Sequence, residues 1–260
     1  MPKNPDQSID QATPMTPEQK FFFDLRGWIV LPAVLVPKEI EEMKAEVYGG
    51  ARTSYQGKFQ NLLDHPAIVR ILSEILSEQP FIRNNCYSFR FEGSFTTVRP
   101  PQQANAMRYQ VAGGRIFSGL TRVVWELEEV KDGQGCTTFL SGSHKAHFGY
   151  GGPNKWAPNI GGSLWEQQMR DMMDGYSCPA GSAAIFTESL IHAANDWMNP
   201  DNPRCAVFNA YNSVWSQWHR TNLSHETIMS MPEKRRTLFR GTWQLGAGGN
   251  REYGEDNRAL

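Results

Sequence analysis

GSAAIFTESLIHAANDWMNPDNPRCAVFNAY, residues 181–211, contains two apolar runs separated by a polar turn. The first run, residues 183–187, and the second, residues 205–211, have the aliphatic and aromatic content of buried β-strands. Residues 199–203 between them hold two prolines and two asparagines, a composition that favours a turn. The stretch therefore predicts two neighbouring buried strands.

One histidine and one arginine border these strands. His192 follows the first strand, and Arg204 directly precedes the second. Side chains at such strand ends can face one cavity of a β-barrel, where a histidine can bind a divalent metal and an arginine can clamp a small carboxylate. The alternative is a hydrogen-bonded core histidine and a surface arginine, and the pair alone is compatible with both.

The composition is that of a folded protein of 260 residues with a formal net charge of −1. Forty per cent hydrophobic residues, including 8 Trp and 14 Phe, are enough for a sizeable core. A charge so close to zero gives no reason to expect a nucleic-acid or membrane partner. The sequence has no apolar run of membrane-spanning length, no signal-peptide pattern and no C-x-x-C spacing. We therefore expect a cytoplasmic protein with reduced thiols.

Along the chain, the expected elements change from helices to strands. Residues 1–15 are polar and contain three prolines, which predicts a mobile tail. Thr16, Pro17 and Gln19 form a helix start with a capping box. Helices are expected at residues 17–26, 37–48, 66–76 and near 232–239, with Asp64 as the cap of the third. Strands are expected at residues 28–31, 86–91, 94–98, 119–127 and 136–140. Residues 51–60 are expected to form a loop.

This order favours a mainly β core with helices packed outside it. Residues 150–162 hold several glycines, prolines and a tryptophan, too long a stretch for an ordinary connection. We expect one domain over residues 16–260 with an insertion near residues 150–175.

Three segments in order carry a family resemblance. Residues 133–145 read GQGCTTFLSGSHK, the segment 181–192 follows, and Arg204 lies twelve positions after His192. The opening FFFDLRGWIVLPAVL, residues 21–35, agrees with the same pattern. Over about residues 16–211 the chain resembles the phytanoyl-CoA dioxygenase family of iron(II)- and 2-oxoglutarate-dependent oxygenases.

The resemblance implies a double-stranded β-helix, which is a cupin-like jelly-roll barrel with a metal at its open mouth. It implies iron(II) and 2-oxoglutarate as cofactors, and hydroxylation or desaturation of a small organic molecule. His192 would be the distal histidine of the iron site, and Arg204 would bind the far carboxylate of 2-oxoglutarate. His144 would shape a turn rather than bind metal.

The metal ligands that the resemblance implies are incomplete. The family takes its first two iron ligands from His-x-Asp or His-x-Glu, since alternate side chains of a strand share a face. None of the six histidines here has an acid two positions later, and residues 98–118 contain neither histidine nor acid. Glu188, four residues before His192, is the remaining candidate for a ligand or general base. It can equally be the partner of Arg204 or Arg122.

Four arginines lie where the metal carboxylate is expected. They would repel a cation and attract an anion, which suits a site for a carboxylate or phosphate without iron, although surface positions explain them equally well. They are Arg99, Arg108, Arg115 and Arg122.

Three functions follow from these observations. The first is an oxygenase of the 2-oxoglutarate class, with His192 and Glu188 as candidate catalytic and metal residues and Arg204 as the cofactor-binding residue. The second is a metal-free family member that binds a small acidic ligand or performs acid–base chemistry. The third is a non-catalytic binding protein. Each function has a small-molecule partner, for which a carboxylate-bearing compound is a candidate. The identity of the substrate and the oligomeric state stay open.

Overall fold

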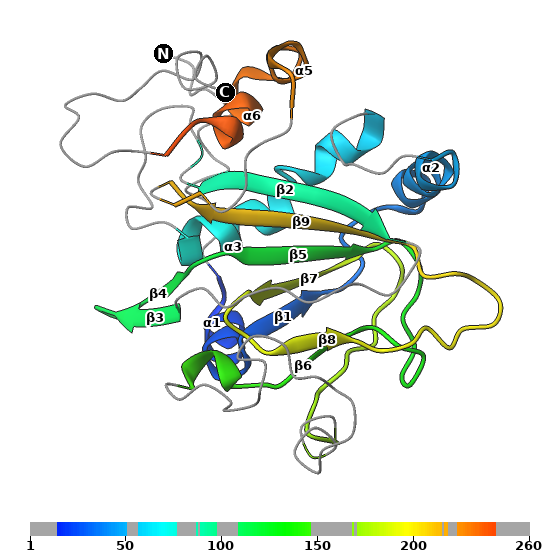
Figure 1. Ribbon diagram of the computed structural model, residues 1–260, viewed down its shortest axis with the longest axis vertical. Coiled ribbons are helices and arrows are strands. Elements are labelled where there is room, and N and C mark those ends of the chain that lie inside the picture. The colour runs from blue at the N-terminus through cyan, green and yellow to red at the C-terminus, as the bar shows by residue number, and fades with distance from the viewer. Residues whose placement is uncertain are drawn as a thin grey trace, which may run out of the picture.

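A five-stranded antiparallel sheet crosses the middle of the molecule, in the order β1-β7-β5-β9-β2 (Figure 1). The computed structural model describes residues 15–50, 57–76, 87, 89–97, 109–146, 168, 171–214, 216–217 and 223–242. Two smaller sheets, β3–β4 and β6–β8, accompany it. The strands are β1 (Trp28–Leu31), β2 (Phe89–Thr97), β3 (Tyr109–Ala112), β4 (Arg115–Ser118), β5 (Thr121–Glu126), β6 (Thr137–Phe139), β7 (Ser182–Thr187), β8 (His192–Ala194) and β9 (Ala206–Ser213).

The two strands predicted from residues 181–211 exist as β7 and β9, but they are not neighbours. β5 lies between them and pairs with both. After β7 the chain leaves the large sheet, forms β8 beside β6, and returns to the large sheet as β9. The expectation of adjacent strands is therefore wrong, because the turn that joins them carries a short strand of a different sheet.

Two further predicted strands, residues 86–91 and 94–98, are parts of one strand. The register of β2 against β9 shifts between Phe91 and Gly93, and pairing continues on both sides of the shift. Such a bulge inserts one residue without ending the strand. Gly93 therefore lies within one continuous strand and not in a turn between two strands.

Three long helices cover one face of the large sheet. They are α1 (Pro17–Arg26), α2 (Pro37–Tyr48) and α3 (Pro66–Leu76). The predicted capping box of α1 is confirmed, since Thr16 Oγ1 accepts from the Gln19 amide and Gln19 Oε1 accepts from the Thr16 amide. The end of the loop expected at residues 51–60 instead belongs to a 3-10 helix, η2 (Gly57–Leu62). Within the described residues, no helix has both the length and the apolar character needed to cross a bilayer.

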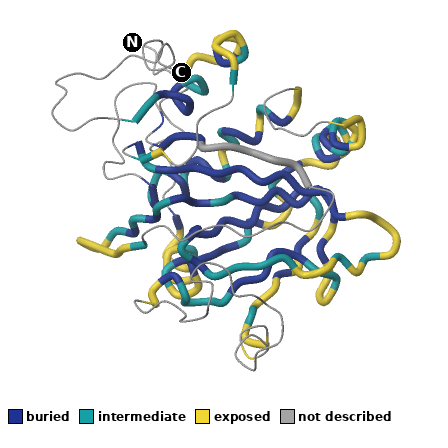
Figure 2. Tube along the Cα trace, in the orientation of Figure 1, coloured by how far each residue is buried: buried dark blue, intermediate teal, exposed yellow. Residues whose placement is uncertain are grey.

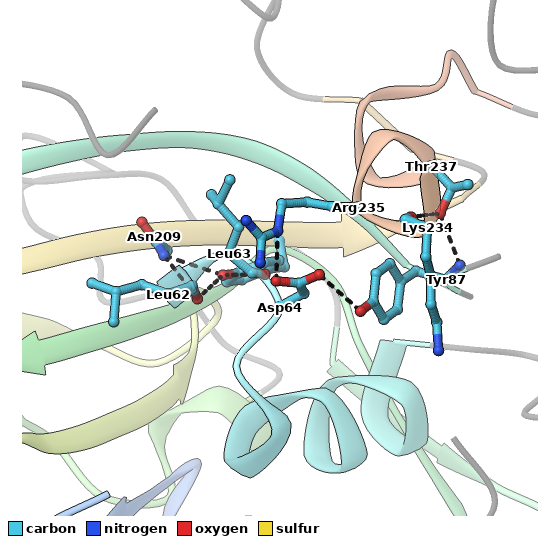
Figure 3. Close-up of polar contacts among 9 residues, drawn as sticks. Leu62, Leu63, Asp64, Tyr87, Asn209, Lys234, Arg235 and Thr237 are labelled. Carbon is cyan, nitrogen blue, oxygen red and sulfur yellow. Dashed lines mark hydrogen bonds and ion pairs between the residues drawn. The ribbon is translucent and has the colours of Figure 1, made fainter. Parts of the chain in front are cut away.

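Asp64 does not cap α3, contrary to the prediction from the sequence. Its carboxylate accepts from the Tyr87 hydroxyl at 2.9 Å and from Arg235 Nε at 2.8 Å (Figure 3). His65 takes its place at the helix start, where its Nδ1 accepts from the Ala67 amide at 3.2 Å. Asp64 therefore links the C-terminal segment, through Arg235, to the rest of the fold.

The C-terminal segment contains α5 (His225–Met229), α6 (Glu233–Arg236) and η4 (Thr237–Phe239). The last two replace the single helix predicted near residues 232–239.

The large sheet separates two apolar clusters. Alternation along β5 places Val123 and Trp125 in the cluster on the helix side and Val124 in the cluster on the other side. The second cluster, which we call the inter-sheet core, packs the large sheet against the small β6–β8 sheet. Figure 2 shows the central strands buried over most of their length. The inter-sheet core contains the aromatic side chains Trp28, Phe139, Tyr176, Phe186 and Phe208.

Two predicted segments lie largely outside the described residues. They are the tail at residues 1–15, of which only Met15 is described, and the insertion near residues 150–175.

Acidification from about pH 7 towards pH 5.5 is expected to destabilise the fold through the buried His144 and the half-buried His65. Burial lowers the pKa of both His65 and His144 below the ordinary value of about 6.5. The unfolded chain therefore binds protons in this window that the folded chain does not, and stability is lost as the pH falls. Urea unfolding at several pH values measures this slope.

The matched variant is His144→Gln. The His144 ring lies edge-on against Tyr109, and its Nε2 is 3.0 Å from the Asp24 carbonyl oxygen. Glutamine does not titrate, so the variant should show a shallower dependence of unfolding free energy on pH. If the pH dependence of the unfolding free energy is unchanged in this variant, His144 binds protons equally in the folded and the unfolded protein.

Candidate functional site

Charged residues enter the inter-sheet core from both ends of β5. Arg122, Val124 and Glu126 alternate along this strand and share the face turned towards the small sheet. Glu126 is fully buried, and the Arg122 side chain is 14% exposed. Because an unpaired buried charge is costly, each must have a partner.

At one end, Arg204 joins the two sheets. It lies just before β9, and its Nε is 3.3 Å from Glu126 Oε2, while its Nη2 donates to Glu126 Oε1. The same Nη2 is 3.3 Å from the Thr137 hydroxyl on β6. Its guanidinium also lies 5.6 Å from the centre of the Phe208 ring. We call these residues, together with Tyr176, the Arg204 cluster.

Tyr176 completes this cluster. Its hydroxyl donates to Glu126 Oε1 at 2.6 Å. Burial, and then the nearby Glu126 carboxylate, raise the pKa of Tyr176 well above its ordinary value, so the hydroxyl stays protonated and remains a donor. For Arg204, burial acts to lower the pKa, but the attraction of Glu126 outweighs it and the net pKa is raised. The guanidinium is therefore a permanent cation inside the fold.

The Arg204 guanidinium is only partly used. Glu126 and Thr137 accept from Nε and Nη2, and Nη1 has no hydrogen-bond partner within the part of the chain that the structure describes. The Thr137 hydroxyl accepts from Arg204, which leaves its own hydrogen free for a further acceptor. An incoming carboxylate would find donors on both groups.

At the other end, Arg122, Glu188 and His192 form a second group, the Arg122 cluster. Arg122 Nε donates to Glu188 Oε2 at 2.7 Å. The sequence left Arg122 and Arg204 open as partners of Glu188, and the structure pairs it with Arg122. Glu188 Oε1, which is buried, faces His192 Nε2 across 3.9 Å. The His192 ring packs against Phe186 at 4.8 Å, on the side of the inter-sheet core.

The hydrogen bond to His192 indicates which tautomer its ring adopts. Its Nδ1 is 2.8 Å from the Leu190 carbonyl oxygen, which can only accept, so Nδ1 carries the proton in the neutral ring. The lone pair of Nε2 is then left on the side of Glu188. Glu188 Oε1 has no hydrogen-bond partner among the described residues. In the neutral ring, two acceptor atoms therefore face each other across 3.9 Å.

These two residues do not make a complete site for ferrous iron. A facial triad needs two histidines and one carboxylate, and its neighbouring ligand atoms, about 2.1 Å from the metal, lie about 3 Å apart. His192 and Glu188 supply one of each, 3.9 Å apart, and Glu188 is already bound to Arg122. Within the described ranges no group of three or more His, Cys, Asp or Glu side chains could hold a metal ion.

The other residues singled out from the sequence lie apart from these clusters. His144 is packed between α1 and β3, where it contacts Tyr109 and the Asp24 backbone. Arg115 lies on the β3–β4 hairpin, 5.6 Å from the Phe117 ring. Arg99 and Arg108 are outside the described residues. Sequence reasoning missed Tyr176 and Thr137, and it placed Glu126 on a core strand without its partner.

One signal in the sequence could have indicated the role of Glu126. It follows Arg122 and Val124 at even spacing on a strand predicted to be buried, so a charged side chain there needs a buried partner. No comparable signal marks Tyr176, because it lies beyond the insertion in an irregular segment.

Comparisons with known proteins agree on the fold. The sequence model of the family described as Phytanoyl-CoA dioxygenase (PhyH) matches residues 51–206. Apo HygX from Streptomyces hygroscopicus is 14% identical, with a TM-score of 0.59 over 83% of this chain and 94% of that one. SnoN, a non-heme alpha ketoglutarate dependent epimerase from nogalamycin biosynthesis, is 16% identical, with a TM-score of 0.53 over 78% and 85%.

SnoK, the carbocyclase of the same biosynthesis, is 14% identical, with a TM-score of 0.52 over 84% of this chain and 92% of that one. A search of curated proteins gives no match. At these identities the solved structures show the fold, and the predicted class is confirmed: mainly β with flanking helices, of the cupin-like jelly-roll type. Within the described residues the sheets do not close into a complete barrel.

Proposed function

Because the chain belongs to the phytanoyl-CoA dioxygenase family, it is an oxygenase-like enzyme, and we propose that Arg204 is its clamp for 2-oxoglutarate. Family membership implies iron(II) and 2-oxoglutarate as cofactors. HygX has been solved with iron, and with nickel and 2-oxoglutarate. The observation that carries the proposal is the buried, partly unused Arg204 guanidinium between the two sheets.

Arg204 suits one carboxylate of 2-oxoglutarate. Nη1 has donors to spare, and the Thr137 hydroxyl beside it can donate as well. Glu126 holds the guanidinium in place, so little conformational freedom is lost on binding. The Phe208 ring supplies an apolar wall for the methylene groups of the ligand.

The Arg122 cluster fits the second cofactor less well. His192 and Glu188 remain the candidate catalytic and metal residues, and the Nδ1–H bond to Leu190 turns the free lone pair of His192 Nε2 to the side that a metal needs. Two ligands nevertheless fall short of the three that a non-haem iron centre requires. When bound, iron would supply the activation of dioxygen in this class of enzyme.

The substrate proposed is a small organic molecule, hydroxylated or desaturated beside His192, and the protein is proposed to be cytoplasmic. HygX has been solved with hygromycin B, and SnoN with nogalamycin RO, both of which are small molecules. The chain is further proposed to form one domain over residues 16–260, which includes the whole family match. Neither nucleic acid nor a membrane is proposed as a partner, in line with the net charge of −1.

Arg204→Lys is expected to weaken 2-oxoglutarate binding by about tenfold or more, because lysine keeps the charge and loses the planar fork. The lysine still pairs with Glu126, so the fold should survive the change. Isothermal titration calorimetry with and without ferrous iron, under anaerobic conditions, measures the affinity.

The matched control for this experiment is Arg115→Lys, which makes the same change on the β3–β4 hairpin and should leave the affinity as in the wild type. If Arg204→Lys binds 2-oxoglutarate as tightly as the control, Arg204 is not the clamp.

A further inference from the structure

A cavity of about 590 Å³ lies at one end of the small sheet, where β6 begins and β8 ends. Its volume is within the range of small-molecule sites, about 300–1,000 Å³. Among the described residues that line it are neither His192 nor Arg204, so a ligand there would not contact the proposed clamp or the candidate metal residues. We propose that this cavity is a second ligand site, which binds a small organic cation of the alkylammonium class.

The two walls of the cavity are fixed to each other. Asp132 lies on the turn before β6, and Asp196 lies just after β8, at the same end of the small sheet (Figure 1). The Asn195 amide donates to the Cys136 carbonyl oxygen at 3.0 Å. A Cβ at Gly135, whose φ is 89°, would lie 2.0 Å from the Asp196 carbonyl oxygen, so this close approach requires glycine. The walls are therefore preformed, which lowers the entropic cost of binding a ligand between them.

The side-chain oxygens that line the cavity include three groups suited to accept hydrogen bonds. The hydrogen of the buried Thr138 hydroxyl is used by the Ala193 carbonyl oxygen at 3.3 Å or by the Met173 sulfur at 3.9 Å, which leaves the oxygen as an acceptor. The carboxylates of Asp132 and Asp196 can only accept when ionised. An ammonium group has hydrogens to donate and no lone pair, so it matches this set of acceptors.

The charges around the cavity also favour a cation. Within the described ranges, the carboxylates of Asp132 and Asp196 form no hydrogen bond or ion pair with another side chain. Lys131 lines the same cavity, but its Nζ lies 3.5 Å from Glu129 Oε2, so a carboxylate outside the cavity already offsets its charge. The two remaining carboxylates attract a positive ligand.

The lining suits an organic cation better than a bare metal ion. In the part of the chain that the structure describes, no group of three or more His, Cys, Asp or Glu side chains could hold a metal. Burial raises the pKa of the Cys136 thiol, so this lining residue stays neutral and is a poor metal ligand. Met173 and Met198 supply flexible apolar surface for a short carbon chain.

Methionine methyl groups provide a direct measurement of binding. The protein, isotope-labelled at these methyl groups, is titrated in the presence of EDTA with putrescine, a short diamine, and followed by NMR. The signals of Met173 and Met198 should shift and saturate, whereas Met229 on α5, which does not line the cavity, should not respond. Butanediol has the same carbon chain without the charge, and succinate has the opposite charge. Neither should shift these signals at the same concentrations.

Two variants test the carboxylates. Asp132→Asn and Asp196→Asn should each weaken the affinity for putrescine by about threefold or more, because each removes one charge and keeps the shape of the side chain. Both positions are exposed, so the variants should fold as the wild type does. Asp201→Asn is the matched control, since it makes the same change on the exposed turn beyond the cavity and should leave the affinity unchanged. High salt should weaken binding to the wild type through screening.

Three results would overturn the inference. The first is the absence of any shift with putrescine. The second is an equal response to butanediol or succinate, which would show that positive charge is not recognised. The third is an affinity for putrescine that both Asp132→Asn and Asp196→Asn leave unchanged. The proposed role of Arg204 is tested separately, because Arg204 does not line the cavity.

Discussion

Replacing Arg204 by methionine is expected to lower the free energy of unfolding by about 3–5 kcal/mol, because removing one partner of a buried ion pair leaves the other charge uncompensated. Glu126 is fully buried, and its carboxylate takes hydrogen bonds from Arg204 and Tyr176. With methionine at position 204, only the Tyr176 hydroxyl remains. Urea unfolding followed by circular dichroism measures the loss.

A double-mutant cycle identifies the cause of this loss. Arg204→Met combined with Glu126→Gln removes both charges, and it should recover most of the stability lost in the single variant. Lys131→Met provides the control, since Lys131 pairs with Glu129 at 3.5 Å on an exposed turn and should change stability by less than about 1 kcal/mol. A double variant as unstable as Arg204→Met would mean that lost packing, not the unpaired carboxylate, sets the cost.

Asp64→Ala is expected to cost about 3–6 kcal/mol, because one carboxylate accepts two hydrogen bonds and hydrogen bonds to charged groups contribute about 1.5–3 kcal/mol each. The partners are Tyr87 and Arg235, which belong to distant parts of the chain (Figure 3). The loss should be concentrated in the C-terminal segment, where hydrogen exchange at residues 233–239 should accelerate more than exchange in β5.

Asp132→Ala is the matched change on an exposed turn, and it should alter stability by no more than about 0.5 kcal/mol. Uniform acceleration of exchange throughout the protein would contradict a local fastening role for Asp64.

Local patterns in the sequence were sufficient to predict most of the elements. The capping box at Thr16 starts α1 where predicted, and Gly27 ends it with a φ of 85°, a conformation that glycine adopts without strain. The stripe of Ile40, Met43 and Val47 is buried on α2 as its helical spacing indicates. These features depend on residues within one or two turns of each other.

Pairings between distant residues could not be predicted in the same way. Glu126 meets Arg204 across 78 positions of sequence, and Glu188 meets Arg122 across 66. Which acid pairs with which arginine depends on strand order and register, because β5 lies between β7 and β9. The role of Asp64 was missed for the same reason: an aspartate before a helix favours a cap, and only the tertiary fold supplies Tyr87 and Arg235 as competing donors.

The strand order also has a consequence for how the protein is made. The two edge strands, β1 and β2, come early in the chain, whereas their partners β7 and β9 are completed only at residues 187 and 213. During synthesis the nascent chain must carry both unpaired strands until most of it has left the ribosome, as expected for a fold of high contact order. A chain that stops before β9 would leave both β2 and β5 without a partner they need, so premature termination should yield an aggregation-prone polypeptide rather than a smaller folded domain.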